Sequence, residues 1–139
     1  MNNIDFVYLK KYFSSQKKIV ITTHRTPDGD ALGSSIALYN ILKSNGHSVN
    51  IVVPNKFPYF LDFLPFSSEV VIFENQQEIG KEMISNADAL FFLDFNNYSR
   101  LDDMAKYILN SDAYSILIDH HQDLKIESNQ SFCDTNICS

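Results

Sequence analysis

Long hydrophobic runs are absent from this chain, and so is the layout of a secretory leader. Its longest useful apolar run is ALFFL at residues 89–93, whereas a membrane helix needs about 18 such residues. The N-terminal stretch MNNIDFVYLKKYFSSQKK lacks the succession of charged, apolar and small-residue regions that marks a signal peptide. We therefore expect a soluble, cytoplasmic protein with no membrane partner.

Cysteine is scarce, and its placement excludes two kinds of structural cross-link. Cys133 and Cys138 lie five positions apart, which fits no zinc-site spacing and no disulfide framework. We interpret both as reduced thiols.

An excess of positive charge is also missing. The chain has 11 lysines and arginines against 17 acidic residues, a net charge of −6. Binding to the phosphate backbone of a duplex normally needs a basic face, so the composition argues against duplex DNA as a partner. A nucleotide substrate is still compatible with this charge, because a bound divalent metal ion can reverse the sign of the potential in a site.

What the sequence does contain is a regular alternation of short β-rich runs and helical stretches over 139 residues, enough for one domain. Alternation of this kind predicts an α/β fold, with an open, mostly parallel, Rossmann-like sheet of about five strands and helices on both faces. We expect the strand order 3-2-1-4-5. The expected strands are 18–23, 48–53, 69–73, 89–94 and 114–119, and the expected helices are 3–15, 30–45, 76–86 and 99–110.

Two features leave alternatives open or favour a plain structural role. Residues 54–66 (PNKFPYFLDFLPF) combine prolines with aromatic side chains. This segment could pack over an edge of the sheet, or it could form a substrate or partner surface. His47 follows the helix-ending Gly46, and we expect it on the surface.

The candidate ligands follow three of the expected strands. His24, Asp28 and Asp30 come after the first, Asp94 ends the fourth, and 119–121 (DHH) ends the fifth. Ligands bind beyond the carboxyl ends of strands in open parallel sheets, so these side chains are expected to converge at one edge. Taken singly, each could be a helix cap or a turn residue. Taken together, the carboxylates would repel one another unless a cation lay between them.

The donor types indicate which metal would bind. Carboxylates and imidazoles without thiolate favour Mn²⁺, with Mg²⁺ or another divalent ion as an alternative. Ligands from several strands can hold two ions about 3.5–4 Å apart. Because Asp94 lies on the strand expected between the other two, it is the natural bridge.

These residues resemble the motifs of the DHH phosphoesterases. Residues 24–34 (HRTPDGDALGS) match the first motif of that family, Leu93-Asp94 the second, and Asp119-His120-His121 the signature that names it. The resemblance spans about residues 17–135 and is strongest to the subgroup of bifunctional oligoribonucleases and 3′-phosphoadenosine 5′-phosphate phosphatases. It implies a phosphoric ester hydrolase of short single-stranded RNA or nucleotides. Cyclic-dinucleotide phosphodiesterase, RecJ-type exonuclease and a non-catalytic metal- or nucleotide-binding module are the alternatives.

The resemblance also implies roles for individual residues. His24, Asp28 and Asp94 would hold one ion, and Asp30, Asp94 and His120 the other. His121 would be catalytic, beside the bridging water and the substrate phosphate, together with Asp94. Asp119 would orient its neighbours from behind the ligands.

Two further side chains are weaker candidates for binding substrate. Arg100 follows Asp94 and could contact a phosphate, although it could also be an ordinary surface arginine. Ser34, with Ser35 beside it, lies in the first turns of a helix whose N-terminus favours anions, although serines there often serve helix packing.

The sequence departs from the family pattern in two respects. Thr26 stands where the subgroup often has Asn, a change we expect to be mild. No counterpart is found for a further metal-binding Asp or for a C-terminal substrate-binding domain, and the setting of Asp134 does not match that ligand. We therefore expect residues 1–139 to be the DHH domain, ending before its last strand or strands, and impaired as a catalyst. The oligomeric state stays open, with a homodimer among the options.

Overall fold

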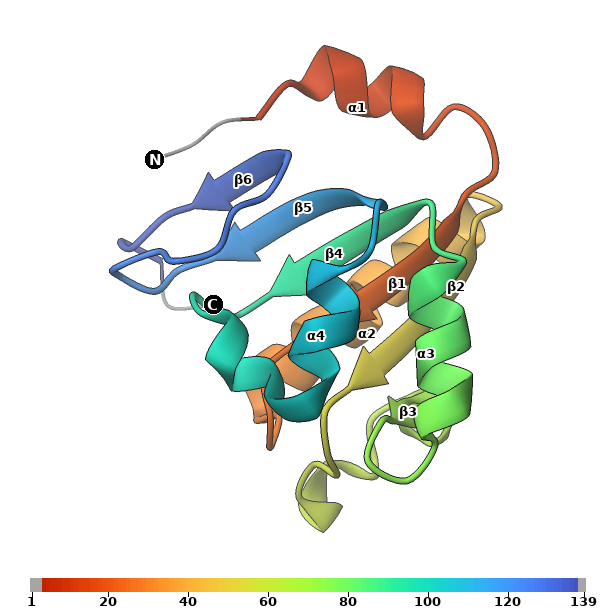
Figure 1. The fold of residues 1–139 in the computed structure, drawn as a ribbon, viewed down its shortest axis with the longest axis vertical. Coiled ribbons are helices and arrows are strands. Elements are labelled where there is room, and N and C mark those ends of the chain that lie inside the picture. The colour runs from red at the N-terminus through yellow and green to blue at the C-terminus, as the bar shows by residue number, and fades with distance from the viewer. Residues whose placement is uncertain (1–3, 138–139) are drawn as a thin grey trace.

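A computed structural model describes residues 4–137 of the chain as a six-stranded sheet in the order β3-β2-β1-β4-β5-β6 (Figure 1). Every neighbouring pair of strands is parallel. The strands are β1 Lys18–Thr22, β2 Ser48–Val53, β3 Val71–Ile72, β4 Ala89–Leu93, β5 Tyr114–Asp119 and β6 Gln130–Cys133. The α-helices are α1 Phe6–Tyr12, α2 Gly29–Ser44, α3 Gln77–Ser85 and α4 Ala105–Leu109, and the 3₁₀ helices are η1 Tyr59–Leu61, η2 Ser67–Glu69 and η3 Tyr98–Met104.

The expected α/β class, the parallel sheet of about five strands and the order of the first five strands are confirmed, and the sheet has a sixth strand beside β5. β6 pairs with β5 from Ile116↔Gln130 to Asp119↔Cys133. Its sequence, QSFC, is short and half polar, and residues 120–129 contain no helix that would indicate a βαβ unit. Neither hydrophobic periodicity nor connection length therefore signals this strand.

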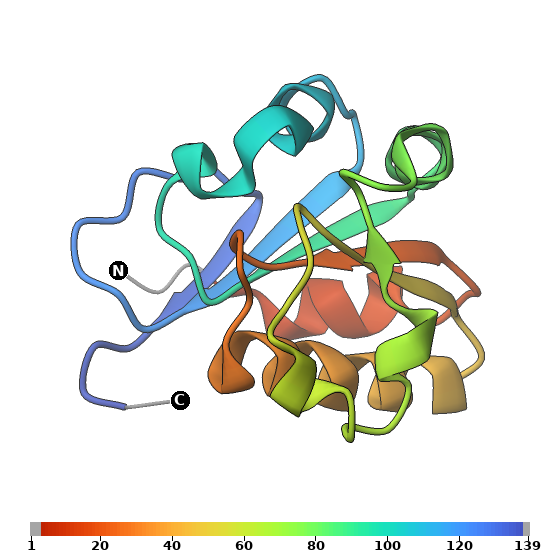
Figure 2. The ribbon, with the colours of Figure 1, turned by 90° about the horizontal axis from the view of Figure 1, so that it is seen from below.

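The helices cover both faces of the sheet, because side chains alternate between the faces along each strand. Ile19 and Ile21 of β1 join a core cluster that includes residues of α2 and is flanked by α1. Val20 points the other way, into a cluster with residues of α3, η3 and α4. Figure 2 shows the resulting layers, with α1 and α2 below the sheet and α3 and α4 above it.

The helical expectations need two corrections. The first helix runs only from Phe6 to Tyr12, and residue 3 lies outside the described part. The expected helix 99–110 is instead the 3₁₀ segment η3 followed by a short α4, with a break at Asp102, whose φ is 48° and ψ −136°. The connection from β4 to β5 is therefore a 3₁₀ segment interrupted at Asp102 and a short α-helix, not one continuous α-helix.

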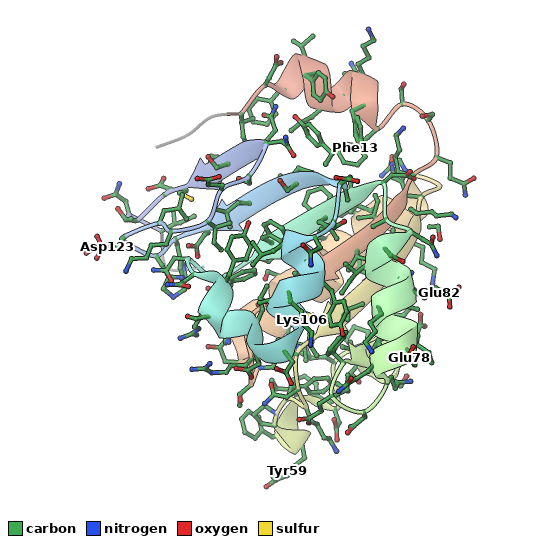
Figure 3. All side chains as sticks on the ribbon, viewed as in Figure 1. Phe13, Tyr59, Glu78, Glu82, Lys106 and Asp123 are labelled. Atoms are coloured by element: carbon green, nitrogen blue, oxygen red, sulfur yellow. The ribbon has the colours of Figure 1, made fainter. Side chains whose placement is uncertain are left out.

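Residues 54–66 both pack on the core and expose aromatic side chains. Phe57 and Leu61 are buried in the cluster beneath α2. Tyr59, Phe60 and Phe63 are 80%, 62% and 79% exposed, and Tyr59 projects away from the body of the molecule in Figure 3. The packing interpretation is thus confirmed for the buried pair, and a substrate or partner surface stays a prediction for the exposed side chains.

The expectation that His47 lies on the surface is wrong. Its side chain is buried against the Phe13 ring, with ring centroids 5.6 Å apart. The His47 Nδ1 lies 3.2 Å from the backbone N–H of Lys17 and accepts its hydrogen bond. His47 therefore joins the segment before β1 to the start of β2, far from the carboxyl ends of the strands.

Over residues 4–137, no helix is both long and apolar enough to cross a membrane.

Candidate metal centre

His24 is the first side chain of the centre, and its neighbours determine which ring nitrogen is available. The His24 Nδ1 lies 2.7 Å from the carbonyl oxygen of Arg25, which can only accept, so Nδ1 carries the proton. The unprotonated Nε2 then faces the carboxylates of Asp94 (3.7 Å) and Asp28 (3.9 Å). A backbone carbonyl that holds one nitrogen and leaves the other free is the usual support for a metal-binding histidine.

Asp28 combines the structural role and the ligand role that the sequence left as alternatives. It is the N-cap of α2, where its Oδ1 accepts from the N–H groups of Asp30 (3.1 Å) and Ala31 (3.0 Å). Its Oδ2 is the oxygen that faces His24. The cap therefore orients the carboxylate toward the centre.

Asp94 lies at the middle of the centre, and its two oxygens face different partners. Its Oδ2 is 3.7 Å from His24 Nε2, whereas its Oδ1 is 3.1 Å from His120 Nε2 and 3.7 Å from His121 Nδ1. The side chain is buried, and the backbone adopts a left-handed conformation with φ of 62°. A strained backbone that aims a buried carboxylate is typical of functional sites.

The DHH segment after β5 supplies the other side of the centre. His120 Nε2 lies 3.8 Å from Asp30 Oδ2 as well as 3.1 Å from Asp94. His121 Nδ1 lies 2.7 Å from Asp119 Oδ1 and donates to it, so its Nε2 carries no proton when the ring is neutral. The adjacent histidines thus have different environments: His120 lies near Asp94 and Asp30, whereas His121 lies near Asp94 and is hydrogen-bonded to Asp119.

The residues present fit a divalent cation. Two groups of donors have atoms that all lie within 4.8 Å of one another: one is His24, Asp28 and Asp94, and the other is Asp94, His120 and His121. Two buried side-chain polar atoms of the described residues have no hydrogen-bond partner, Thr23 Oγ1 and Asp119 Oδ2. Each belongs to a residue next to a candidate ligand, His24 or His120. Crowded carboxylates are costly in a protein, and a cation between them offsets that cost.

The structure brings every predicted ligand to one edge of the sheet. Ser34 lines a small cavity there with Asp30, Asp94 and His120, although its hydroxyl bonds the carbonyl of Ala31 within α2. The hydroxyl of the neighbouring Ser35 is fully buried and serves helix packing. The assignments of individual residues to metal or substrate stay predictions.

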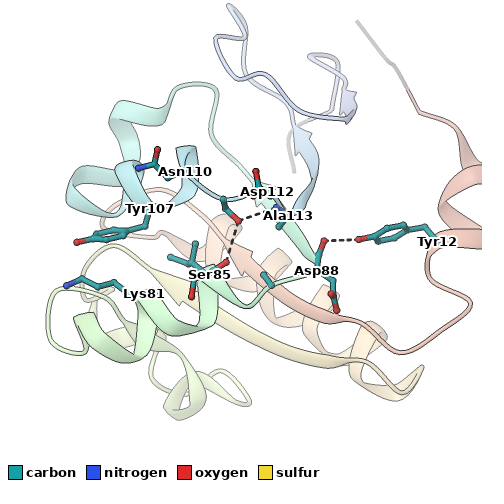
Figure 4. A pocket seen from close by; sticks show the side chains of 11 residues that line it. Tyr12, Lys81, Ser85, Asp88, Tyr107, Asn110, Asp112 and Ala113 are labelled. Atoms are coloured by element: carbon teal, nitrogen blue, oxygen red, sulfur yellow. Dashed lines mark hydrogen bonds between the residues drawn. The ribbon is translucent and has the colours of Figure 1, made fainter.

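A separate cavity of about 440 Å³ lies at the opposite, amino end of the strands. Figure 4 shows it between α3 and α4, near the hydrogen bond from the Tyr12 hydroxyl to the Asp88 carbonyl. Its lining residues include none of the candidate ligands. The metal centre and this cavity are therefore unrelated.

Sequence analysis missed the contacts that hold the loops of the centre together. Arg25 bonds the segment after β4, and Asn55 bonds Thr26 through both backbone and side chain. The only sequence signal for the first contact is that Arg25 and Arg100 are the chain's two arginines and follow two ligand-bearing strands.

The pH dependence of stability should reveal the His24–Asp94 contact in protein stripped of metal. The Asp94 carboxylate raises the pKa of His24 above its ordinary value of 6.5, and the Arg25 carbonyl adds to this, against the opposing effects of burial and of Arg100. The folded state therefore binds the proton more tightly than the unfolded state does. The resulting stabilisation is complete below pH 6.5 and is lost as the pH rises through the folded-state pKa. In urea unfolding with chelator present, His24→Gln should lower the free energy of unfolding more at pH 6 than at pH 8. A loss of unfolding free energy that grows with pH would contradict this.

Replacing Thr26 by asparagine should stabilise the chain by a modest amount. Thr26 has φ of 48°, a conformation that strains a β-branched residue and that asparagine tolerates. We expect Thr26→Asn to add about 1 kcal/mol, seen as a melting temperature higher by roughly 3–5 °C. Thr26→Ser, which removes only the branching methyl, should gain less. A lower melting temperature for Thr26→Asn would show that the strain is absent.

Three known proteins resemble this chain in structure or in sequence. It is 38% identical to an exopolyphosphatase-related protein from Bacteroides fragilis of known structure, with a TM-score of 0.92, over 96% of this chain and 39% of that one. The structure of RecJ from Thermus thermophilus in complex with Mn²⁺ shares the fold at a TM-score of 0.55 and 16% identity, over 95% of this chain and 16% of that one. In sequence, 51 residues are 49% identical to the bifunctional oligoribonuclease and PAP phosphatase NrnA of Thermus thermophilus, covering 37% of this chain and 15% of that protein.

The chain thus spans well under half the length of these relatives. Residues 18–137 match the DHH family, N-terminal domain. That range contains all three strands that carry the candidate ligands, and both donor groups lie within it. The chain belongs to the DHH family.

Proposed function

We propose that this chain carries the two-metal centre of a phosphoester hydrolase that acts on short oligoribonucleotides and on 3′-phosphoadenosine 5′-phosphate. The observation that carries the proposal is the Asp94 carboxylate, whose oxygens face His24 on one side and His120 on the other. A carboxylate shared in this way is the arrangement expected of a bridge between two ions.

Each half of the centre has its own set of donors. His24 and Asp28 would hold one ion with Asp94 Oδ2, and Asp30 and His120 would hold the other with Asp94 Oδ1. Carboxylate and imidazole donors favour Mn²⁺, with Mg²⁺ or another divalent ion as the alternative. When bound, such ions supply Lewis acidity toward phosphoryl oxygens and a water of lowered pKa.

The protein itself handles the proton and the substrate. Asp119 holds the proton on His121 Nδ1, so Nε2 is the atom that can accept or deliver a proton at the reacting phosphate. Arg100 and Ser34 are the candidate phosphate contacts, because the Arg100 carbonyl is bonded to Arg25, next to His24, and Ser34 lines the cavity beside Asp94. α2 points its N-terminus, capped by Asp28, toward the same place, and helix N-termini favour phosphate.

The similarity to NrnA supports the choice of substrates, because its printed activities are oligoribonuclease and PAP phosphatase. The chain's net charge of −6 fits a small nucleotide held by metal ions better than it fits duplex DNA. The sequence identity of 38% to the exopolyphosphatase-related protein supports an enzyme that hydrolyses bonds to phosphate groups.

The test incubates the chain with 3′-phosphoadenosine 5′-phosphate or with the dinucleotide pApA. The AMP formed from each substrate is measured by chromatography. We expect turnover in Mn²⁺, none in chelator, and none from duplex DNA. Asp94→Asn should be inactive. Asp123→Asn is the matched control, because Asp123 is also an aspartate at positive φ (57°, against 62° for Asp94) but is exposed outside the centre.

Other outcomes would select among the alternatives. Hydrolysis of a cyclic dinucleotide alone, or stepwise degradation of long single-stranded DNA alone, would replace the proposed substrates. Tight Mn²⁺ binding without turnover of any of these would make the chain a metal-binding module.

A further inference from the structure

Arg25 reaches from the loop after β1 to the loop after β4 and bonds it in three places. Its backbone N–H donates to the carbonyl of Arg100 at 2.7 Å. Its Nη1 donates to the carbonyl of Ser99 at 3.0 Å and to the carboxylate of Asp102 at 2.9 Å. The acceptors all lie within residues 99–102.

The two carbonyls belong to the peptide groups on either side of Arg100. The Ser99 carbonyl precedes the Arg100 Cα, and the Arg100 carbonyl follows it. Because Arg25 bonds both, it restricts the backbone from which the Arg100 side chain extends. Arg25 directly follows the candidate metal ligand His24. The bond from its backbone N–H to the Arg100 carbonyl therefore holds the backbone of Arg100 beside the metal centre.

Asp102 completes this connection in a backbone conformation that favours glycine. Its φ of 48° and ψ of −136° lie in a region where a side chain is costly. Its carboxylate nevertheless makes the ion pair with Arg25. Both side chains of the pair are about half exposed (50% and 47%), and exposed ion pairs contribute little to stability. The main effect of this ion pair is therefore to fix the geometry of the loop, not to stabilise the fold.

We propose that Arg25 and Asp102 form a clasp that positions Arg100 for the phosphate of the substrate. Arg25 and Asp102 are positioning residues, and Arg100 makes the contact. The proposal rests on the proposed function, because it assigns the site a phosphate ligand.

The first experiment measures AMP binding to the Mn²⁺-loaded chain by calorimetry. We expect Arg100→Ala to weaken AMP about tenfold, the loss typical of one charge-assisted hydrogen bond, and Arg25→Ala to weaken it several-fold. The double variant should be no weaker than Arg100→Ala alone, because Arg25 acts through Arg100. Arg25→Lys should rescue binding only in part, since an ammonium is not the planar fork of a guanidinium. Lys106→Ala, which removes an exposed cation of α4, is the control and should bind as the unchanged chain does.

Asp102→Gly separates positioning from stability. It relieves the backbone strain while it removes the carboxylate, so we expect an equal or higher melting temperature together with several-fold weaker AMP binding. In turnover, Arg25 and Asp102 variants should raise KM and leave kcat and Mn²⁺ affinity unchanged. Additive losses in the double variant, or AMP binding by Asp102→Gly equal to that of the unchanged chain, would overturn the clasp.

A second measurement decides the clasp even if the proposed function fails. Absence of Mn²⁺ and AMP binding by the unchanged chain would refute the proposed function. In the metal-free chain, NMR order parameters of the backbone amides of residues 99–102 should then be those of rigid backbone and should fall in Arg25→Ala. Equal order in both chains would refute the clasp on its own terms.

Discussion

Asp94→Asn is expected to weaken Mn²⁺ binding at both positions of the centre, by roughly a hundredfold or more. Even residues behind the ligands cost 10–100-fold in metal affinity when changed, and Asp94 faces both donor sets directly. Asparagine keeps the size of the side chain but loses the negative charge that two cations would share. It also tolerates the left-handed backbone at this position, where φ is 62°. The variant should therefore fold normally, so that the loss reports on the metal.

The matched comparison is Asp28→Asn, titrated with Mn²⁺ in the same calorimetric assay. Asp28 belongs to only one of the two donor groups, the one with His24 and Asp94, and asparagine caps a helix as well as aspartate does. We expect this variant to lose one ion and retain the other, while Asp94→Asn loses both. Two ions bound by Asp94→Asn with unchanged affinity would show that Asp94 is no bridge. Equal losses in the two variants would show that the donors act as a single site.

The parts of this fold that were predictable are those in which one local pattern determines the outcome. β1 and β4 are buried apolar runs, β5 is partly buried, and candidate ligands lie at or just after the end of each. Strands whose ends share ligands must be neighbours, and the adjacency of β1, β4 and β5 follows from that requirement. β6 could not be predicted in this way. Its residues are mostly only half buried, and it pairs with the edge of β5 without carrying a candidate ligand.

The same distinction applies within the centre. The convergence of the ligands was predictable, because strand ends place them irrespective of side-chain detail. Backbone strain was not, since aspartate is compatible with both positive and negative φ, and the sequence does not reveal that Asp94 and Asp102 are both at positive φ. The bonds of Arg25 were hidden for another reason: two of its three acceptors are backbone carbonyls, which every residue has. The wrong expectation for His47 has a similar cause, because a backbone N–H is its hydrogen-bond partner.

The neighbouring histidines His120 and His121 should give opposite results when each is replaced by asparagine. His120 Nε2 faces Asp94 and Asp30 at 3.1 and 3.8 Å, so His120→Asn should remove one of two Mn²⁺ ions. His121 instead donates a hydrogen bond from its Nδ1 to the buried Asp119, which orients the ring and leaves Nε2 as the atom that can accept a proton. His121→Asn should therefore retain both ions and lose turnover by roughly 10²–10⁴-fold, the range of general acid–base catalysis.

Metal content and turnover must be measured on the same samples to separate these outcomes. Manganese bound per chain, counted after gel filtration, should be halved in His120→Asn and unchanged in His121→Asn, while hydrolysis of pApA falls in both. Asp119→Asn should resemble His121→Asn in a milder form. The amide oxygen can still accept the hydrogen bond from His121 Nδ1, but it lacks the negative charge of the carboxylate. His121 belongs to one of the two donor groups whose atoms lie within 4.8 Å of one another, so it could instead be a metal ligand. Loss of an ion in His121→Asn would make His121 a ligand, and the proton transfer would then have to be assigned to another group.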